Sequence, residues 1–562
     1  MGQNRCKRQC SHLAWTTLLF TLTLVCAHAG EMPLERSRMV NTRETTPVLD
    51  SEANRLELGS IPMPFADWAL VEAGQNEWVG PDGKTLPLDG PHGLTSPDEA
   101  RAIPLGFAHG VAIRAQEATK AGVFSDMVPV EHPWERANMK ARTLLYDEAA
   151  HVYRVWYECP GGLAYAESAD LKTWRKPLTN PTAFGDRTHS NLAYIANRDE
   201  CAASGMFQKP DALEVAQSGT VFVDPSAPPD ERFKTTTLAS ATPEKLHAFA
   251  KEKGKPLSSR VSDMSANVLF PAVSADGVAW RVIPEPNLLH DADTQTVVFF
   301  DTRIRRYVAY TRLWEFGRRA IGRAESKDFR DFPLPRAVLS PDANEAPYID
   351  YYANAMARYP GRDDLHLMFV LAYDRRTENS VVRAATSRDG ALWRFAPGGP
   401  VLRPGTAKDW DSHFVLPVPS FVRAPDGDLL LLYSAYNQPH KFPRAGFVEG
   451  NQGVARWKAD RLSAIEAESE GSFTTPYLRL LGSKIILNVQ TARTGEVRVE
   501  LCDRDLQPLP GCSVLDCDPI VGDHVAFTVT WKGNSNVPTL DNSSARIRVQ
   551  MRSTKIFALS AE

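Results

Sequence analysis

One short sequence element recurs along the chain and restricts the possible folds more than any other feature. It reads Ser-x-Asp, followed after three further residues by an aromatic residue. Its complete copies are Ser168-Asp170-Trp174, Ser274-Asp276-Trp280, Ser326-Asp328-Phe332 and Ser387-Asp389-Trp393. A fifth, degenerate copy covers residues 456–462. Each copy closes a unit of short strand-like segments, and units of roughly 40–50 residues built from short strands are typical of β-propeller blades.

The Ser and Asp of this element have a local role in the backbone of a turn. Their short polar side chains donate to and accept from nearby backbone groups. The aromatic residue that follows is expected to pack between neighbouring sheets. We therefore interpret the repeated Asp residues as structural and not as catalytic acids.

The repeating units divide residues 137–466 into five expected blades. The blades cover residues 137–180, 186–285, 290–340, 348–403 and 409–466, and the second contains an insertion near 192–218 and a helical stretch over 243–255. Residues 471–562 contain alternating runs that predict the antiparallel strands of a β-sandwich. The expected fold class is all-β: a five-bladed β-propeller followed by a β-sandwich. Residues 30–136 are expected to form an N-terminal extension with the first strands.

Residues 1–29 have the pattern of a signal peptide. Lys7 and Arg8 precede a short apolar run, residues 13–25, and residues 27–29 read Ala-His-Ala, as at a cleavage site. The run is too short for a membrane span. We therefore expect a secreted or periplasmic protein without a membrane span after cleavage. The alternative is that the segment remains as an uncleaved anchor.

The charge of the chain argues against some classes of partner. Lys and Arg number 64, Asp and Glu number 68, and the net charge is -4. This balance does not favour nucleic acid or an anionic membrane surface as a partner. The sequence has no Cys-x-x-Cys pair and no His cluster with zinc-ligand spacing. We expect neither a metal nor another cofactor.

The starts of three expected blades are unusually polar for strands that line the centre of a propeller. The third blade begins with Asp291, Asp293 and Gln295, the fourth with Asp350 and Asn354, and the fifth with Asp411 and His413. Because the innermost strands of a propeller meet around one funnel, we expect Asp293, Asp350 and Asp411 to converge. A buried carboxylate is costly, so a cluster of them indicates a function. The alternative is that each caps a turn or pairs with an Arg.

Loops between the second and third strands should lie on the same face as the blade starts. They carry Glu158, Arg312, Trp314, Glu315, Asp374 and His440. Aromatic faces beside polar donors suit a sugar, which is apolar on its ring face and polar at its rim. The predicted catalytic residues are Asp293, Asp350, Asp411 and Glu158. The predicted substrate-binding residues are Asp291, Gln295, Arg312, Trp314, Glu315, Asn354, Asp374, His413 and His440.

Several longer segments together resemble a known group of proteins. They read HDADTQTVVFFD, RRAIGRAESKDF, ATSRDGALW, KDWDSHFV and EGSFTTPYLRLLGSKIILNV. Over residues 137–560 the chain resembles secreted bacterial glycosyl-hydrolase-like proteins related to family 32. The resemblance implies a five-bladed propeller of the invertase, levanase and arabinanase type. It also implies an Asp nucleophile or base on an inner strand, a second Asp that positions the sugar, and a Glu acid.

The match to the fructosidase motifs of that group is partial. Glu158-Cys159-Pro160 matches the acid motif Glu-Cys-Pro, although it ends the second strand of the first blade, whereas in invertases the motif opens a later blade. The Asn-Asp-Pro-Asn and Arg-Asp-Pro motifs are missing. These departures argue against fructosidase activity.

The sequence therefore predicts an exported carbohydrate-active protein, a glycoside hydrolase with paired carboxylates at a central propeller pocket. One alternative is a non-catalytic glycan-binding propeller. The other is a sialidase-like hydrolase, for which Arg312, Arg319 and Tyr351 are the candidate residues. A Glu within hydrogen-bond range of the Asp cluster would favour the hydrolase.

Overall fold

The computed structural model describes residues 56–72, 77–79, 85–87, 103–104, 108–261, 266–441, 450–504, 506–538 and 543–562. The chain divides into two compact units, one of Leu56–Glu72 and Ala108–Glu562, the other of Met1–Arg55 and Ala73–Phe107. The latter unit contains a three-stranded sheet of β3 (Glu77–Val79), β4 (Thr85–Pro87) and β5 (Ile103–Pro104). The predicted signal peptide lies outside the described residues. Among the described helices, none is both long and apolar enough to cross a membrane.

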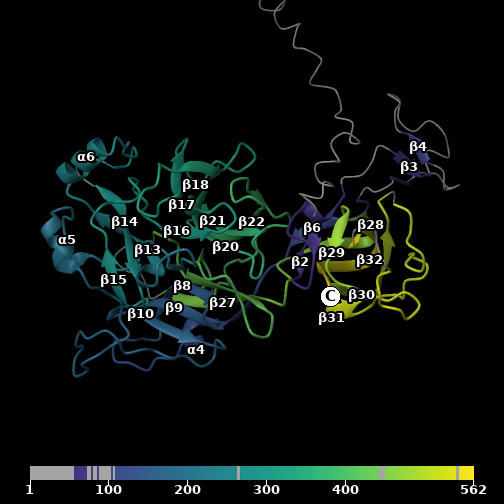
Figure 1. Cartoon of the computed structure of the whole chain (residues 1–562), viewed down its shortest axis with the longest axis horizontal. Coiled ribbons are helices and arrows are strands. Elements are labelled where there is room, and N and C mark those ends of the chain that lie inside the picture. Colours follow the sequence, from purple (N-terminus) through teal and green to yellow (C-terminus); the bar gives the residue numbers. More distant parts are fainter. Residues whose placement is uncertain are drawn as a thin grey trace, which may run out of the picture. The chain divides into compact units, whose positions relative to one another are not determined.

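Five small antiparallel sheets follow one another along the larger unit, and Figure 1 labels their strands. Blade one has β8 (Lys140–Asp147), β9 (Val152–Cys159) and β10 (Gly162–Ser168). Blade two has β12 (Phe222–Val223), β13 (Phe233–Ser240), β14 (Asn267–Ser274) and β15 (Ala279–Val282), with β11 (Tyr194–Ile195) parallel to β15. Blade three has β16 (Val297–Asp301), β17 (Arg306–Glu315), β18 (Arg318–Ser326) and β19 (Arg336–Leu339). Blade four has β20 (Ile349–Arg358), β21 (His366–Asp374), β22 (Ser380–Ser387) and β23 (Arg394–Phe395).

The fifth blade contains β24 (Phe414–Pro417), β25 (Val422–Arg423), β26 (Leu429–Tyr436) and β27 (Asn451–Trp457). Its outermost strand comes from far earlier in the chain: β7 (Thr119–Val123) pairs antiparallel with β27. The segment before residue 137 therefore supplies one strand of the propeller. This strand fixes the last blade to the beginning of the domain.

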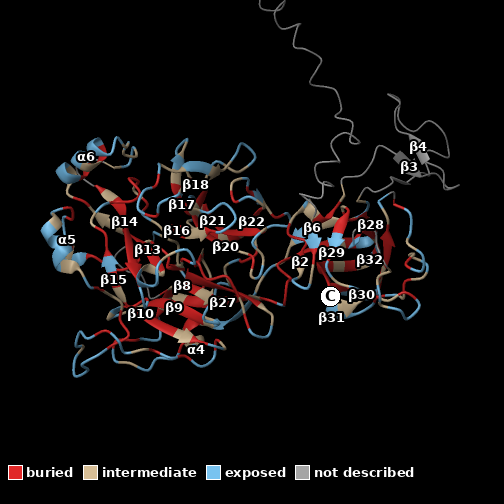
Figure 2. Ribbon diagram, viewed as in Figure 1, coloured by how far each residue is buried: buried red, intermediate tan, exposed pale blue. Residues whose placement is uncertain are grey.

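Packing between the sheets closes the propeller into a ring. Five separate hydrophobic clusters fill the five interfaces between consecutive blades. The cluster between blades five and one, for example, joins Leu432 and Val454 to Tyr157 and Ala164. Each sheet is therefore covered on both faces, and Figure 2 shows its strands as mostly buried. The predicted all-β, five-bladed architecture is confirmed.

The helices lie at the periphery of the propeller. They are α4 (Phe124–Met127), α5 (Arg198–Ser204) and α6 (Pro243–Glu252), with short 3-10 turns η4 (Pro210–Ala212) and η5 (Pro229–Glu231). The sequence prediction of a helical stretch in blade two is confirmed by α6. This helix buries Leu246 and Ala250 in the interface between blades one and two and exposes its other faces.

The repeated Ser-x-Asp element forms the expected turn in each complete copy. In the fourth copy, Asp389 Oδ1 accepts from the backbone N–H groups of Ala391 and Leu392, both at 2.8 Å. Ser387 Oγ accepts from the N–H of Gly390 at 2.8 Å. The aromatic residue, Trp393, is buried and donates to Gly390 O at 3.0 Å. The polar atoms of this turn are thus satisfied within seven residues of sequence.

The C-terminal strands form one hydrogen-bonded network around a separate core. Its strands are β1 (Glu57–Leu58), β2 (Met63–Pro64), β6 (Ala112–Ala115), β28 (Ser463–Thr474), β29 (Leu478–Leu480), β30 (Ile485–Cys502), β31 (Asp523–Thr528) and β32 (Ser544–Ala561), and the turn η2 (Trp68–Leu70) follows β2. Register shifts in β28 and β30 accompany the folding of this network into a β-sandwich. Three of the strands, β1, β2 and β6, come from residues that precede the propeller.

Candidate functional site

The polar starts of the inner strands share one face of the propeller with the loops that follow the second strands. At the start of β20, Ile349 pairs with Asp374, the last residue of β21. The β17–β18 hairpin reaches the same level, because Arg318 Nε donates to Ile349 O at 3.0 Å. In blades three and four, the blade starts therefore lie beside the loops that follow the second strands, as expected.

Tyr352 lies at the centre of this face because β20 contains a bulge. The register of β20 with β21 shifts between Tyr351 and Ala353, which leaves Tyr352 as the extra residue. Its ring lies 4.1 Å from the guanidinium carbon of Arg312 and 4.7 Å from that of Arg319. Its backbone oxygen accepts from Arg312 Nε at 3.0 Å. Tyr352 therefore holds two arginines from blade three beside the inner strand of blade four.

Carboxylates of blades three and four pair with these arginines. Asp350 is completely buried, and its Oδ2 accepts from Arg319 Nη1 at 2.6 Å. Arg375 Nε lies 3.5 Å from Asp350 Oδ1. Asp293 pairs with Arg312, and its side chain remains 50% exposed. One carboxylate is thus buried between guanidinium groups, while the other opens to solvent.

Aromatic rings border the same group. Trp314, 38% exposed, packs under the guanidinium of Arg319 at 4.5 Å and under that of Arg260 at 5.4 Å. The hydroxyl of Tyr352 bonds to His440 Nε2 at 2.9 Å. The imidazole of His440 stacks on Phe414 with ring centroids 4.5 Å apart. The group therefore combines guanidinium, carboxylate and aromatic surfaces.

Buried polar atoms without a hydrogen-bond partner in the protein gather here. Seven residues of this face have such atoms: Asp291, Thr294, Arg312, Arg319, Asp350, Asn354 and His440. We call these seven residues the blade-start cluster. Asn354 is the extreme case, since its amide is buried and neither its oxygen nor its nitrogen has a partner. Buried polar groups are satisfied in the great majority of cases, so such a concentration indicates a place where another molecule supplies the partners.

Burial also changes the proton affinity of groups in the cluster. It raises the pKa of the Asp291 carboxyl; nearby Arg260, with its Nε 3.7 Å from the carboxylate, opposes this, and the negative charge of Asp293 adds to it. Burial lowers the pKa of His440 to about 4, so this imidazole is neutral at pH 7. Burial likewise lowers the pKa of Arg312. Asp291 and Asp293 are therefore two carboxyls in different environments, one enclosed and one open.

Other predicted residues on blades three and four have local partners. Gln295 Nε2 donates to the backbone oxygens of Asn354 and Pro417, and it thereby links blades three, four and five. Glu315 accepts from Ser340 Oγ on the outer side of blade three. Asp374 pairs with Arg376 at 3.1 Å.

The remaining predicted residues lie in other blades. Asp411 is buried in the fifth blade, where it pairs with Lys120 of β7 at 2.6 Å and accepts from Tyr433 at 2.9 Å. His413 contacts Ser412 Oγ at 3.1 Å. Glu158 pairs with Arg142 at 2.5 Å. In the described part of the chain, no hydrogen bond or ion pair joins Asp411 or Glu158 to Asp293 or Asp350.

Tyr351, the tyrosine considered for a sialidase-like site, faces away from the two arginines. Its hydroxyl donates to Glu345 at 2.9 Å, and its ring packs edge-on against Phe395 of β23. Tyr352 occupies the place beside Arg312 and Arg319 instead. Strand alternation alone does not reveal a bulge, so this exchange could not be predicted from the sequence. Thr294 and Arg375 lie beside the predicted Asp293 and Asp374 but were not themselves predicted as site residues, and Arg260 lies outside the segments that the sequence singled out.

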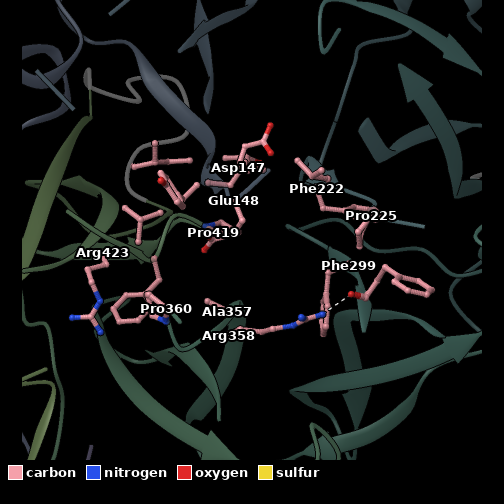
Figure 3. Close-up of a pocket in the computed structure, with 18 of the residues that line it drawn as sticks. Asp147, Glu148, Phe222, Pro225, Phe299, Ala357, Arg358, Pro360, Pro419 and Arg423 are labelled. Atoms are coloured by element: carbon pink, nitrogen blue, oxygen red, sulfur yellow. Dashed lines mark hydrogen bonds between the residues drawn. The ribbon is translucent and has the colours of Figure 1, made fainter. Parts of the chain in front are cut away.

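A cavity of about 1290 Å³ lies at the other end of the inner strands (Figure 3). All five blades line it, through Asp147, Phe222, Phe299, Arg358 and Arg423. None of the residues predicted from the sequence as catalytic or substrate-binding lines it. Of the carboxylates that line it, Asp147 is paired with Arg154 at 2.7 Å and Arg232 at 2.6 Å, and Asp224 is paired with Lys234 at 2.8 Å. Glu148 and Asp363 also line the cavity.

Among the described residues, no group of three or more His, Cys, Asp or Glu side chains is arranged to hold a metal ion.

Comparisons with known proteins give structural similarity only. No protein-family model matches the sequence, and no curated protein matches it. Among solved structures, a glycoside hydrolase matches 61% of this chain and 92% of its own, at 15% identity and a TM-score of 0.34. An N-acetylgalactosamine deacetylase from F. plautii matches 63% and 97%, at 12% identity and a TM-score of 0.39. An endo-arabinase from Bacteroides thetaiotaomicron matches 57% and 94%, at 13% identity and a TM-score of 0.34. At these identities and scores the similarity does not identify what this chain does.

Proposed function

We propose that the protein is a glycoside hydrolase whose site is the blade-start cluster. The observation that carries this proposal is the gathering of seven residues with unpartnered buried polar atoms beside an exposed Trp. A sugar has many hydroxyl groups that can satisfy such atoms, and an apolar ring face that packs on an aromatic side chain. In the cavity at the opposite face, two of the carboxylates that line it, Asp147 and Asp224, are already held in ion pairs.

Within this proposal, Asp291 and Asp293 divide the chemistry. Asp291, whose pKa is raised by burial, is the proton donor and protonates the glycosidic oxygen as the bond to the anomeric carbon breaks. Asp293, exposed and paired with Arg312, attacks that carbon or takes a proton from the attacking water. An enclosed carboxyl as the acid and an open carboxylate as the nucleophile or base are the usual division of roles in this reaction.

Asp350 has a positioning role in the proposed mechanism. It is buried and bonded to Arg319, so it fixes a guanidinium beside the substrate and does not itself reach the reacting atoms. Asp411 and Glu158, which the sequence also predicts as catalytic, remain candidates for the same tests. Their partners are Lys120 and Arg142, respectively.

A screen of glycans with the purified protein tests the proposal, and substitutions identify the residues. Asp291→Asn and Asp293→Asn should each lower kcat by ~100-fold or more, the scale for losing a positioned acid or base. Asp186→Asn, at an exposed carboxylate outside the cluster, is the matched control and should leave kcat unchanged. Because Asp291 must be protonated, activity should fall as pH rises through its raised pKa. The residual activity of Asp291→Asn should lack this alkaline decline.

A glycan-binding protein without catalysis is the second candidate. It is favoured by the fact that Asp293 and Asp350 are both paired with arginines, which could leave no carboxylate free to react. In that case the wild type would bind glycans without any turnover, and Asp291→Asn would change affinity only modestly. Turnover abolished by Asp411→Asn or Glu158→Gln but retained by the Asp291 and Asp293 variants would move the active site to another blade.

We also infer that the protein is exported, from the signal-peptide pattern of residues 1–29. The mature chain should begin at Gly30, directly after the Ala-His-Ala cleavage pattern. N-terminal sequencing of the protein from the periplasm or the culture medium tests this. A mature protein that still begins before residue 13 would contradict it.

A further inference from the structure

We propose that the blade-start cluster binds a sugar that carries a carboxylate, a uronic acid, and that Arg312 and Arg319 hold this carboxylate. The inference rests on the proposed glycan site and names its substrate class. The guanidinium groups of these two arginines are enclosed by protein, and each still has N–H donors without an acceptor.

Each of the two arginines has one buried nitrogen without a hydrogen-bond partner in the protein. Arg312 donates from Nε to Tyr352 O and from Nη1 to Asp293, while its buried Nη2 has no partner. Arg319 donates from Nη1 to Asp350, and its buried Nε has no partner. The Arg312 side chain is only 2% exposed, so solvent does not readily supply what is missing. An acceptor brought by a ligand would complete both groups.

Both guanidinium groups contact the ring of Tyr352, at 4.1 Å for Arg312 and 4.7 Å for Arg319. The positive charge of Arg319 adds to burial in lowering the pKa of Arg312, so the two charges repel each other. A carboxylate has two oxygens in one plane, which match the planar donors of arginine in number and geometry. Such a group would reduce this repulsion.

The charge balance of the site leads to the same conclusion. Its arginines are Arg260, Arg312, Arg319 and Arg375, and its carboxylates are Asp291, Asp293 and Asp350. The site therefore has one positive charge more than it has carboxylates, and a protonated Asp291 would raise the excess to two. Glu378 and Lys441, which lie near His440, have opposite charges and shift its pKa in opposite directions, so together they do not change this balance. A ligand with one negative charge is therefore favoured over a neutral sugar.

The aromatic border favours a sugar over a simple organic anion. Trp314 presents an exposed ring directly under Arg319, so a ligand held by that arginine lies next to an apolar surface. A uronic acid has both features, a carboxylate at one carbon and an apolar ring face. Sulfated or phosphorylated sugars offer a tetrahedral anion, which the planar arginine pair matches less closely.

Calorimetric titration of the full-length mature protein tests this proposal with D-glucuronate and D-galacturonate against D-glucose and D-galactose. Each acid should bind at least ~10-fold more tightly than its neutral counterpart, and the preference should weaken as salt is added. Arg319→Gln should reduce the affinity for the acid to that for the neutral sugar. Arg336→Gln, at an exposed arginine of β19, is the matched control and should keep the preference.

The possible outcomes separate this inference from the proposed function. Equal affinity for acidic and neutral sugars would overturn the carboxylate site but leave the glycan site intact. Tighter binding of glucose 6-sulfate or glucose 6-phosphate than of glucuronate would show that a different anion is recognised. Absence of binding by any of these sugars would overturn both proposals. A preference for the acid that persists in Asp291→Asn, without turnover in the wild type, would support the carboxylate site and contradict the hydrolase.

Discussion

Aspartate residues at the two faces of this propeller are stabilised in different ways. In the Ser-x-Asp turn, Asp389 accepts from two backbone N–H groups two and three residues ahead. These bonds lower its pKa although burial opposes the change. At the blade starts, Asp291 has a buried Oδ1 without a partner and a raised pKa. At the turn face an Asp carboxylate finds its hydrogen-bond partners within a few residues of the chain, whereas at the other face Asp291 has a carboxylate oxygen without a partner.

The difference shows how to distinguish structural from functional carboxylates in a repeat protein. A turn Asp recurs with its partners in the four complete copies of the element, because those partners belong to the same few residues. The blade-start residues have partners from more distant strands, as Asp293 has in Arg312 of the same blade and Asp350 in Arg319 of the neighbouring blade, while Asp291 Oδ1 has none. A carboxylate that recurs with the same local partners is therefore structural. A carboxylate outside the repeated pattern is a candidate for ligand binding.

Removal of the buried carboxylate at the blade starts should have the largest effect on stability. Asp350→Ala leaves Arg319 and Arg375 without their shared carboxylate in a buried place. Breaking such a pair costs about 3–5 kcal/mol. Chemical denaturation of the variant measures the free energy of unfolding. Asp350→Asn, which keeps the size and one acceptor, should lose less, and equal losses would show that the charge is unimportant.

An intermediate effect is expected at Asp301, which ends β16 at the opposite face. Burial opposes a low pKa here, but His366, the backbone N–H of Arg303 and the charge of Arg358 outweigh it and lower the pKa to about 2. Since the folded-state pKa lies below the ordinary value of 3.8, the stabilisation is present above pH 4 and is lost as pH falls towards 2. It amounts to about 2 kcal/mol.

Asp301→Asn measures this stabilisation. The variant should be less stable than the wild type at pH 7, and the two should approach each other near pH 2. Denaturation curves at several pH values give the comparison. A difference that stays constant over this range would mean that the carboxylate charge contributes nothing.

A smaller effect is expected in the turns. Asp389→Ala removes three hydrogen bonds of an exposed turn, from Ser387 Oγ and from the N–H groups of Ala391 and Leu392, and should cost about 1 kcal/mol. Sugar binding by the folded protein should be unchanged, because the turn lies at the other end of the blade. Thermal unfolding and titration of the same preparation test both statements. A fully stable variant that fails to bind sugar would contradict the assignment of the two faces.

The smallest effect on stability should come from Trp314. Its ring is partly exposed, so Trp314→Ala should change the free energy of unfolding by no more than about 0.5 kcal/mol. Affinity for the sugar should nevertheless fall, because the apolar surface for its ring is lost. Trp314→Ala should therefore change binding but not stability, whereas Asp389→Ala should change stability but not binding. An unchanged affinity would place the sugar elsewhere.

The turns, the five blades and the general location of the polar blade starts could be predicted from the amino-acid sequence alone. Asp389, Ser387 and Trp393 could be interpreted correctly because all their hydrogen bonds close within a few residues. Asp291, Asp293 and Asp350 could be selected because charged residues are unusual in strands that line a core. Which side chains would pair with them depends on residues from other strands and other blades.

The assembly of the site depends on contacts between strands that are far apart in the sequence. The bulge in β20 brings Tyr352 to the arginines and turns Tyr351 away, and hydrophobic pattern alone does not predict it. The pairing of β7 with β27 brings Lys120 to Asp411 across nearly the whole length of the propeller sequence. Local hydrogen bonds can be inferred from neighbouring residues. Contacts between distant segments depend on register and on the closure of the ring, which no single segment specifies.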